Sequence, residues 1–243
     1  MNKITMRCRH TTHPRINFLL QAVVLLAMRN KIKTLFVAAF LAFAAIPLLA
    51  QDLPAPWKHQ DIGTSQVPGS AEQSQDGFTL QGTRDIWGAA DGCHFAWRPC
   101  RGDVEIVARV SVMENPGKIG HAKASLCIRE SLQPGARNVT MCVTPVDGTQ
   151  FLVREKADGK TVRIFPEPEA QKEAVPKAHF PCWLKLVRRG NEFSGYESLD
   201  GQKWLRTAQI RLDLPADTVV GLAASSHKPD VLTKAVFDKV KVI

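Results

Sequence analysis

The stretch Val104-Glu105-Ile106-Val107-Ala108-Arg109-Val110-Ser111-Val112 decides the fold class of this chain. Its apolar residues stand at every second position, and polar residues fill most of the positions between them. Side chains alternate between the two faces of a β-strand, so this period of two predicts a strand with one face in a core. The segment Trp183-Leu184-Lys185-Leu186-Val187-Arg188 repeats the theme. We therefore expect β-structure at both places.

Turn residues separate the apolar segments along most of the chain. Asp147-Gly148, Asp158-Gly159, Gly190-Asn191 and Asp200-Gly201 are pairs of the kind favoured in tight hairpins, which require positive φ. They predict two antiparallel meanders, and other short apolar runs bring the total to about a dozen strands. The expected strands are 78–80, 94–97, 104–112, 123–129, 139–144, 150–156, 161–165, 183–188, 192–198, 203–210, 219–225 and 235–242.

This number of strands predicts two packed sheets, because one open sheet of that size would fold onto itself. No helix-length period of 3.6 residues stands out, so the predicted fold class is all-β, a two-sheet antiparallel β-sandwich. Residues 166–181 contain four prolines, each of which removes a ladder donor, and they predict a crossover loop.

The N-terminal region predicts export. Residues 28–33 form a short cationic segment, residues 35–49 are apolar, and Ala50 precedes polar residues. This order predicts a signal peptide at 28–50, cleaved after Ala50, and a secreted, periplasmic or cell-envelope location. Residues 1–27 are interpreted as a gene-start extension ahead of translation from Met28. A retained N-terminal anchor is the alternative, and an uncleaved leader is the only expected contact with a membrane.

The basic charge of the chain is concentrated in this leader. The whole sequence has 32 Lys and Arg against 23 Asp and Glu, and residues 1–50 hold seven of the basic residues and no acidic one. Residues 51–243 therefore carry 25 basic residues against 23 acidic ones, a net charge of +2. A balance so close to neutral gives no reason to expect nucleic acid as a partner.

Several short words along residues 57–243 carry a resemblance to a known family. They are Asp85-Ile86-Trp87-Gly88, His94-Phe95, 102–110, Ile128-Arg129-Glu130-Ser131, Val143-Thr144-Pro145, 183–190, Gly221-Leu222-Ala223 and 237–242. In this order they resemble the bacterial secreted domains of concanavalin A-like, laminin-G-like fold, which are largely of unknown function. The resemblance implies a single jelly-roll domain at 51–243, of a kind often attached to polysaccharide-degrading enzymes or surface proteins. Lectins, binding modules, glycanases and lyases share this fold, so the fold does not choose the activity.

No catalytic motif stands out in the sequence. Retaining glucanases of this fold carry Glu-x-Asp-x-x-Glu on one strand, and the nearest match here is the run Glu197-Ser198-Leu199-Asp200-Gly201. Asp200 belongs to a predicted turn, so it cannot share a strand face with Glu197. Nucleophile elbows, zinc-protease helices and phosphate-binding loops are also missing from the sequence. We predict no catalytic residue and lean against an enzyme.

Other residues are candidates for ligand binding. Trp87, His94 and Trp97 occur in one short stretch with Asp85, and flat aromatic faces beside hydrogen-bonding groups suit a sugar ring. The alternative is that these aromatics fill the core. Arg129 and its neighbour point to opposite strand faces, so a buried charge there needs a partner in a structural network or lines a groove. The candidate partners are His227 and Arg109, and the candidate ligand-binding residues are Asp85, Trp87, His94, Trp97, Arg129, Glu130 and His227.

Residues 51–243 contain five cysteines, an odd number that cannot pair completely within the chain. A symmetric hairpin through Pro134-Gly135 would place Cys127 opposite Cys142, which predicts a disulfide. Cys93 and Cys100 could instead close a small hairpin loop, and the third alternative is that all five are small buried hydrophobes.

Metal binding has weaker support in the sequence. Asp85, Asp91 and Asp103 could supply oxygens to Ca²⁺, but no loop has the spacing of a calcium motif, so we predict no metal and no cofactor.

Three functions follow from these observations. The first is a non-catalytic module that binds a polysaccharide or another glycan. The second is a glycan-active hydrolase or lyase, in which Asp85, Glu105 and Glu130 converge. The third is a structural or protein-binding sandwich with an exposed apolar patch. The oligomeric state is left open.

Overall fold

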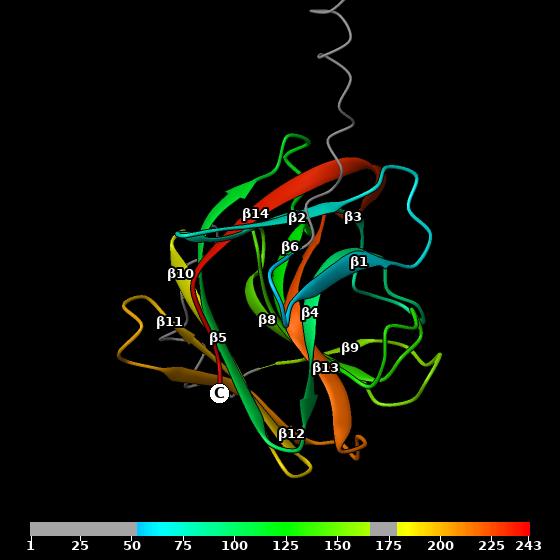
Figure 1. Cartoon of the computed structure of the whole chain (residues 1–243), viewed down its shortest axis with the longest axis vertical. Coiled ribbons are helices and arrows are strands. Elements are labelled where there is room, and N and C mark those ends of the chain that lie inside the picture. Colours follow the sequence, from blue (N-terminus) through cyan, green and yellow to red (C-terminus); the bar gives the residue numbers. More distant parts are fainter. Residues whose placement is uncertain (1–52, 166–178) are drawn as a thin grey trace, which may run out of the picture. The chain divides into compact units, whose positions relative to one another are not determined.

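The computed structural model describes residues 53–165 and 179–243, which form two antiparallel sheets of seven strands each (Figure 1). The first sheet has the order β1-β4-β13-β6-β7-β8-β9, and the second has the order β12-β11-β10-β5-β14-β3-β2. The strands are β1 (Lys58–Ile62), β2 (Ser70–Ser74), β3 (Gly77–Arg84), β4 (Cys93–Arg101), β5 (Val104–Glu114), β6 (Lys123–Arg129), β7 (Asn138–Thr144), β8 (Gly148–Arg154), β9 (Val162–Ile164), β10 (Cys182–Arg189), β11 (Glu192–Ser198), β12 (Leu205–Arg211), β13 (Asp217–Ser225) and β14 (Lys228–Val242).

This topology confirms the predicted all-β, two-sheet antiparallel sandwich. Both predicted meanders are present, as β7-β8-β9 in the first sheet and β10-β11-β12 in the second. Every expected strand is found, and the prediction missed only β1 and β2. These two are edge strands whose sequences, KHQDI and SAEQS, are largely polar and leave most side chains partly or fully exposed.

The predicted leader and its boundaries at 27 and 50 lie outside the described residues, as does most of the predicted crossover loop. Within the residues that the structure describes, no helix is long and apolar enough to span a membrane.

The main core lies between the two sheets. Val104, Ile106, Ala108 and Val110 of β5 are buried in it, as the alternating pattern predicts, whereas Val112 near the end of the strand is 41% exposed. Leu126 of β6 and Leu222 of β13 belong to the same cluster and come from the first sheet.

The outer face of the first sheet is also buried. Every residue of β6, β7 and β8 is buried, although alternate residues point away from the main core. A second apolar cluster covers part of this face and contains Ile86 with Cys93, Phe95 and Cys127. Ile86 belongs to residues 85–92, the segment between β3 and β4, which we call the covering loop. This loop positions the candidate site.

The pairing of β6 with β7 corrects the predicted disulfide. Cys127 lies opposite Thr140 and Cys142 lies opposite Ser125, so the register differs by two residues from the predicted one. All five cysteines of the described residues are free thiols. Burial raises the pKa of Cys127 to about 11 and that of Cys142 to about 12.

The other cysteine predictions fare differently. Cys93 and Cys100 are both on β4, so they cannot close a hairpin loop between two strands. The buried-thiol interpretation holds for all of the described cysteines except Cys100, which is partly exposed.

Candidate functional site

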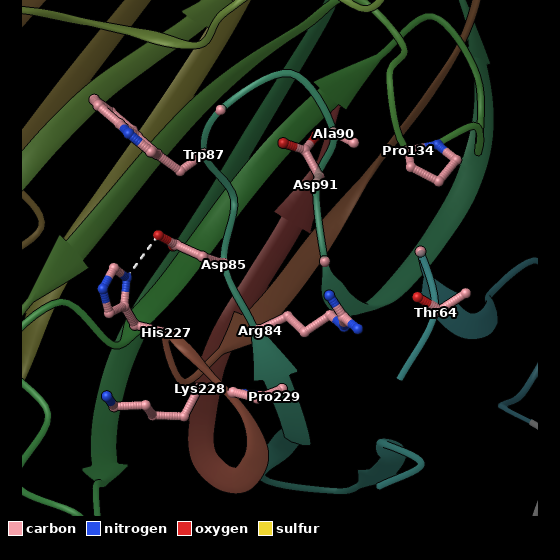
Figure 2. A pocket seen from close by; sticks show the side chains of 13 residues that line it. Thr64, Arg84, Asp85, Trp87, Ala90, Asp91, Pro134, His227, Lys228 and Pro229 are labelled. Carbon is pink, nitrogen blue, oxygen red and sulfur yellow. Dashed lines mark hydrogen bonds and ion pairs between the residues drawn. The ribbon is translucent and has the colours of Figure 1, made fainter. Parts of the chain in front are cut away.

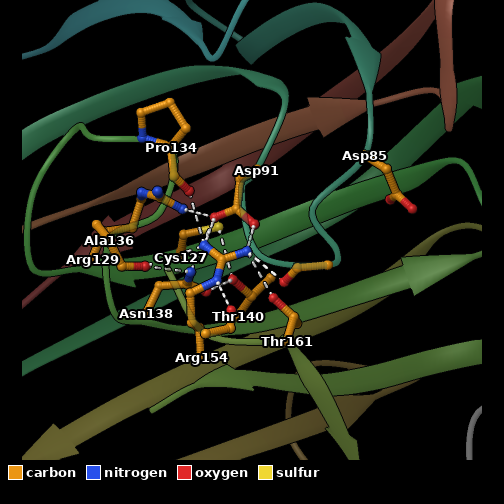
Figure 3. A network of polar contacts seen from close by, with 12 residues as sticks. Asp85, Asp91, Cys127, Arg129, Pro134, Ala136, Asn138, Thr140, Arg154 and Thr161 are labelled. Atoms are coloured by element: carbon orange, nitrogen blue, oxygen red, sulfur yellow. Dashed lines mark hydrogen bonds and ion pairs between the residues drawn. The ribbon is translucent and has the colours of Figure 1, made fainter. Parts of the chain in front are cut away.

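A buried ion network fixes the covering loop to the outer face of the first sheet (Figure 3). The Asp91 carboxylate accepts from Arg129 Nη1 at 2.5 Å, and from Arg154 Nη2 and Nη1 at 2.6 and 2.9 Å. Asn138 Nδ2 donates to the same carboxylate at 3.0 Å. The Arg129 and Arg154 side chains are 1% and 0% exposed, so neither charge has access to water. One carboxylate therefore pairs with two buried guanidinium groups from neighbouring parts of the sheet.

Backbone hydrogen bonds complete the attachment of the loop. The Asp91 N–H donates to the Pro134 carbonyl at 2.8 Å, and the Gly92 N–H donates to the Asp85 carbonyl at 2.7 Å. The Gly88 carbonyl accepts from the Thr161 N–H at 2.7 Å and from Arg154 Nη2 at 3.2 Å. Gly88 has φ of 66°, which glycine adopts without a steric cost. The loop is thus held at both ends and near its tip.

A groove of about 610 Å³ runs beside this loop (Figure 2). Asp85 lies at its centre, where one carboxylate oxygen accepts from the buried Lys123 ammonium and the other contacts His227 Nδ1 at 2.7 Å. Arg84 and Lys228 line the same groove. Figure 2 shows the Arg84 side chain and the Lys228 side chain extending in different directions from the strand ends below Asp85.

A second hollow of about 290 Å³ shares Asp85, Trp87 and His227 with the groove. Its other lining residues are polar and come from the first sheet or its loops: His121, Lys123, Asp147, Gln150 and Arg163. The Asp147 carboxylate accepts from Gln150 Nε2 at 3.0 Å, and lies 3.2 Å from His121 Nδ1 and 3.8 Å from Arg163 Nη1. The His121 and His227 ring centroids are 5.3 Å apart.

Trp87 stands where the two hollows meet. It lines both, and it is 45% exposed although it is a large apolar side chain. The loop that carries it is fixed by the Asp91 network, so the indole ring is presented from a firmly held backbone. The arrangement joins one accessible aromatic face to carboxylate, guanidinium, amide and imidazole groups.

The structure separates Trp87 from His94 and Trp97, which the sequence analysis grouped with it. His94 and Trp97 are three residues apart on β4, and therefore on opposite faces of the first sheet. His94 is 3% exposed, with Nδ1 at 2.7 Å from Asp61 Oδ1 and Nε2 at 2.9 Å from His59 Nδ1. Trp97 is partly buried against the second apolar cluster. For these two side chains, the alternative that they serve the protein interior fits the structure better.

The acidic partner of His94 has a perturbed pKa. Burial raises the pKa of Asp61, but hydrogen bonds from His94 and from the Gly69 backbone N–H outweigh this effect. The result is a pKa below the ordinary value of 3.8. Asp61 is therefore stabilised as a carboxylate in the folded protein.

Arg129 belongs to the Asp91 ion network and does not line the groove. Of the two interpretations offered by the sequence, the structural network is the one that fits. The candidate partners were wrong, however, because His227 pairs with Asp85 and Arg109 pairs with Asp238. Glu130 points elsewhere and receives two hydrogen bonds from Arg137, at 2.8 and 2.7 Å. The Arg137 guanidinium lowers the pKa of Glu130.

The carboxylates predicted for an enzyme do not converge. Asp85 lines both hollows, whereas Glu105 lies on β5 of the second sheet beside Arg189 and Glu130 is held by Arg137. Asp200 caps its turn, with backbone hydrogen bonds from Gln202 and Lys203 that lower its pKa.

The aspartates considered for Ca²⁺ are likewise engaged in separate places. Asp103 accepts from the Gly190 N–H at 2.7 Å, while Asp85 and Asp91 hold basic side chains. Across residues 53–165 and 179–243, no group of three or more His, Cys, Asp or Glu could hold a metal ion.

Sequence reasoning missed several lining residues. Lys123, Gln150 and Arg163 lie on three different strands, and His121 and Asp147 lie in loops. One signal was available: Lys123, Ser125, Cys127 and Arg129 alternate with apolar residues on β6, which marks a second, polar face.

Comparisons with known proteins support the fold. The sequence matches no protein-family model and no curated protein. A functionally unknown protein from Saccharomyces cerevisiae is 13% identical, with a TM-score of 0.56 over 76% of this chain and 95% of that one. Xylan β-1,4-xylosidase from Bacillus halodurans C-125 is 14% identical, with a TM-score of 0.49 over 68% of this chain and 32% of that one. Lectin I-B4 from Griffonia simplicifolia, in its metal-free form, is 10% identical, with a TM-score of 0.45 over 80% and 96%. At these identities the likeness concerns the fold.

Proposed function

We propose that this chain is a non-catalytic carbohydrate-binding module of the secretome or cell envelope, and that it binds a glycan in the groove beside Trp87. The observation that carries the proposal is Trp87 itself, a 45% exposed indole between two hollows lined by hydrogen-bonding groups. A sugar ring has an apolar face that packs on an aromatic ring and hydroxyl groups that need donors and acceptors at its edge. Asp85, Gln150 and Arg163 provide such groups.

The firm attachment of the covering loop supports a binding role. Ordering a loop or side chain during association costs free energy, and a loop that is already fixed avoids this cost. The contacts of Asp85 on one side of Trp87, and those of Gly88 and Asp91 on the other, hold the backbone before any ligand arrives. Buried charges are expensive, so a network of this kind at a ligand groove is consistent with the positioning of a binding residue.

The carboxylates of the site support a non-catalytic role. Glycoside hydrolysis normally uses two carboxyl groups, one of which donates a proton. Here Asp85 contacts Lys123 and His227, and Asp91 contacts Arg129 and Arg154. Each of these carboxyl groups is thus already engaged by two basic side chains of the protein itself.

A glycan hydrolase or lyase is the second candidate, and one observation favours it. His227 contacts Asp85 and His121 contacts Asp147, which places two imidazole–carboxylate pairs side by side with ring centroids 5.3 Å apart. Such pairs are able to move protons. Analysis of reaction products therefore belongs in the test of binding.

The domain boundaries form part of the proposal. We assign residues 28–50 to a signal peptide, 51–243 to the sandwich domain and 1–27 to an extension ahead of the true start. N-terminal sequencing of the precursor and of the exported protein tests this assignment. A first residue at Met28 in the precursor and at Gln51 in the exported form is expected, and any other pair of start sites contradicts it.

The test of function is a survey of binding to a broad panel of polysaccharides and oligosaccharides, monitored through tryptophan fluorescence. The reaction products are then analysed for every glycan that binds. We expect saturable binding without new reducing ends or unsaturated products. Trp87→Ala should abolish it. Trp204→Ala is the matched control. Trp204 lies between β11 and β12 of the second sheet and contacts Trp183 and Lys185 of β10.

The outcomes separate the candidates. Binding that depends on Trp87 but not on Trp204 supports the proposal. Product formation favours the enzyme, and Asp85→Asn and His227→Ala then identify the proton-transfer groups. Binding that survives Trp87→Ala contradicts the assigned site, and no binding to any glycan contradicts the function.

A further inference from the structure

The charges around the Trp87 groove are not balanced. Each of the three aspartates that line the two hollows already has two basic neighbours: Lys123 and His227 for Asp85, Arg129 and Arg154 for Asp91, and His121 and Arg163 for Asp147. No acidic side chain of the groove is therefore left to attract a cationic ligand.

Two further cations line the groove without a counter-ion from the part of the chain that the structure describes. Arg84 and Lys228 are paired positions in the ladder of β3 and β14, and among the described residues neither side chain has an ion pair. The Arg84 Nε–H is in addition buried without a hydrogen-bond partner in the described residues. A buried donor of this kind normally finds an acceptor, from the protein, water or a ligand. The two side chains diverge in Figure 2, which separates their charges but supplies neither with an anion.

A count of fixed charges gives the size of the excess. The cations that line the hollows or stand behind Asp91 are Arg84, Lys123, Arg129, Arg154, Arg163 and Lys228, six in all, against the carboxylates of three aspartates. The excess is three positive charges with the histidines neutral. Residues 51–243 have a net charge of only +2, so the two hollows and the arginines behind Asp91 together hold more positive charge than the domain as a whole. Walls of low dielectric concentrate such a potential in the groove.

We propose that the groove selects an anionic glycan, a chain that carries uronate carboxylates or sulfate esters. This inference rests on the proposed carbohydrate-binding function and names its ligand class. The apolar face of one sugar packs on Trp87, and an acidic group of the chain accepts hydrogen bonds from Arg84. Lys228, which extends from the same strand ends in another direction, contacts a second acidic group. Repeated charges along a polymer suit two cations that point apart.

The experiment compares matched glycans that differ only in charge. Sodium polygalacturonate is paired with its carboxyl-reduced form, and κ-carrageenan is paired with its desulfated form. Binding to the purified protein is measured by affinity electrophoresis and by calorimetry with oligosaccharides of each polymer. We expect at least one charged member to bind at least tenfold more tightly than its neutral partner. The carboxylate and sulfate pairs show which acidic group is recognised. Added salt should weaken binding, because screening reduces the attraction of exposed charges.

Variants locate the effect. Arg84→Gln should lower the affinity for the charged glycan by about tenfold to a hundredfold, the usual range for a lost hydrogen bond between charged groups. Lys228→Gln should lower it by up to about fivefold, since Lys228 is exposed. Lys203→Gln is the control, an exposed lysine in the turn between β11 and β12. It should leave affinity unchanged. Because Arg84→Gln alters a partly buried residue, its unfolding curve is recorded, and Lys228→Gln keeps the test decisive if that variant fails to fold.

The outcomes distinguish this inference from the function on which it rests. Equal binding of charged and neutral members, with dependence on Trp87, overturns the anionic preference and leaves carbohydrate binding intact. If Lys203→Gln weakens the binding of charged glycans as much as Arg84→Gln and Lys228→Gln do, the attraction is unspecific. This result also overturns the anionic preference. If neither pair binds and no glycan of the survey binds, both proposals are overturned.

Discussion

Replacement of Asp91 by asparagine tests whether the buried ion network holds the covering loop. Asparagine keeps the shape of the side chain but removes its charge, and leaves Arg129 and Arg154 facing each other's charge without a counter-ion. These two side chains are 1% and 0% exposed, so water cannot take over the lost interaction. Removal of one partner from a buried ion pair costs about 3–5 kcal/mol.

The free energy of unfolding is measured by urea titration and the melting temperature by calorimetry. For a protein of this size, a loss of about 3–5 kcal/mol corresponds to a melting temperature lower by roughly 6–20 °C. Asp217→Asn is the control, because its ion pair with Arg101 is exposed, with side chains 75% and 78% accessible. It should cost less than about 1 kcal/mol. A cost below about 1 kcal/mol for Asp91→Asn would refute the reasoning, since it would mean that the two guanidinium groups do not need the carboxylate.

Three further predictions concern other parts of the fold. A Cβ at Gly221 would lie 2.0 Å from a backbone carbonyl oxygen of β4, so Gly221→Ala should cost about 1–3 kcal/mol in a urea titration, and a neutral effect would contradict the packing of β13. The pKa of Asp61 is lowered in the folded state, so its carboxylate stabilises the protein above pH 3.8, and this contribution is lost as the pH falls through the lower folded pKa. The difference in unfolding free energy between wild type and Asp61→Asn should therefore shrink below pH 3.8. A difference that grows would refute the assignment. Burial raises the pKa of Cys127 to about 11 and that of Cys142 to about 12, so both thiols should resist iodoacetamide at pH 8 in the folded protein and react in urea. Peptide mass spectrometry measures this modification. A disulfide between them in the untreated protein would contradict the free thiols.

The period-two pattern was sufficient to predict the fold class and most strands. Residues 104–112 carry the alternation because one face of β5 packs in the core and the other does not. β1 escaped prediction because it is an edge strand whose residues are mostly polar, so burial leaves almost no pattern in its sequence. Hydrophobic periodicity reports burial, and strands with little burial remain hidden from it.

The register of one hairpin could not be predicted from its turn residues. Pro134-Gly135 was taken as the centre of the turn between β6 and β7, but the Glu130 N–H donates to the Arg137 carbonyl at 3.0 Å, so the turn centres one residue earlier. That displacement moves the partner of Cys127 by two positions, from Cys142 to Thr140. A disulfide inferred from assumed symmetry is therefore sensitive to a small error in the turn.

The candidate site was predicted in part. Asp85, Trp87 and His227 were predicted as ligand-binding residues, and the structure brings them together in the lining of the same two hollows. His94 and Trp97 do not join them, and the strand period already implied that these two face opposite sides of β4. Lys123 lies opposite Ser225, in the pairing of β6 with β13, which joins distant segments and is not specified by local sequence patterns. Arg163 lies opposite Leu152 in the pairing of β8 with β9, and the turn residues predicted this meander without showing which side chains reach the site.

The most direct test of the account is to observe which tryptophan meets the glycan. The sequence contains five tryptophans, so the ¹⁵N-labelled protein should give five indole N–H signals in an NMR spectrum, and Trp87→Phe identifies the signal of Trp87. The protein is titrated with an oligosaccharide of the glycan that binds best in the survey. The account predicts that the Trp87 signal shifts with saturation while those of Trp183 and Trp204 stay in place. A titration that moves the Trp183 or Trp204 signal and leaves Trp87 unchanged would contradict it.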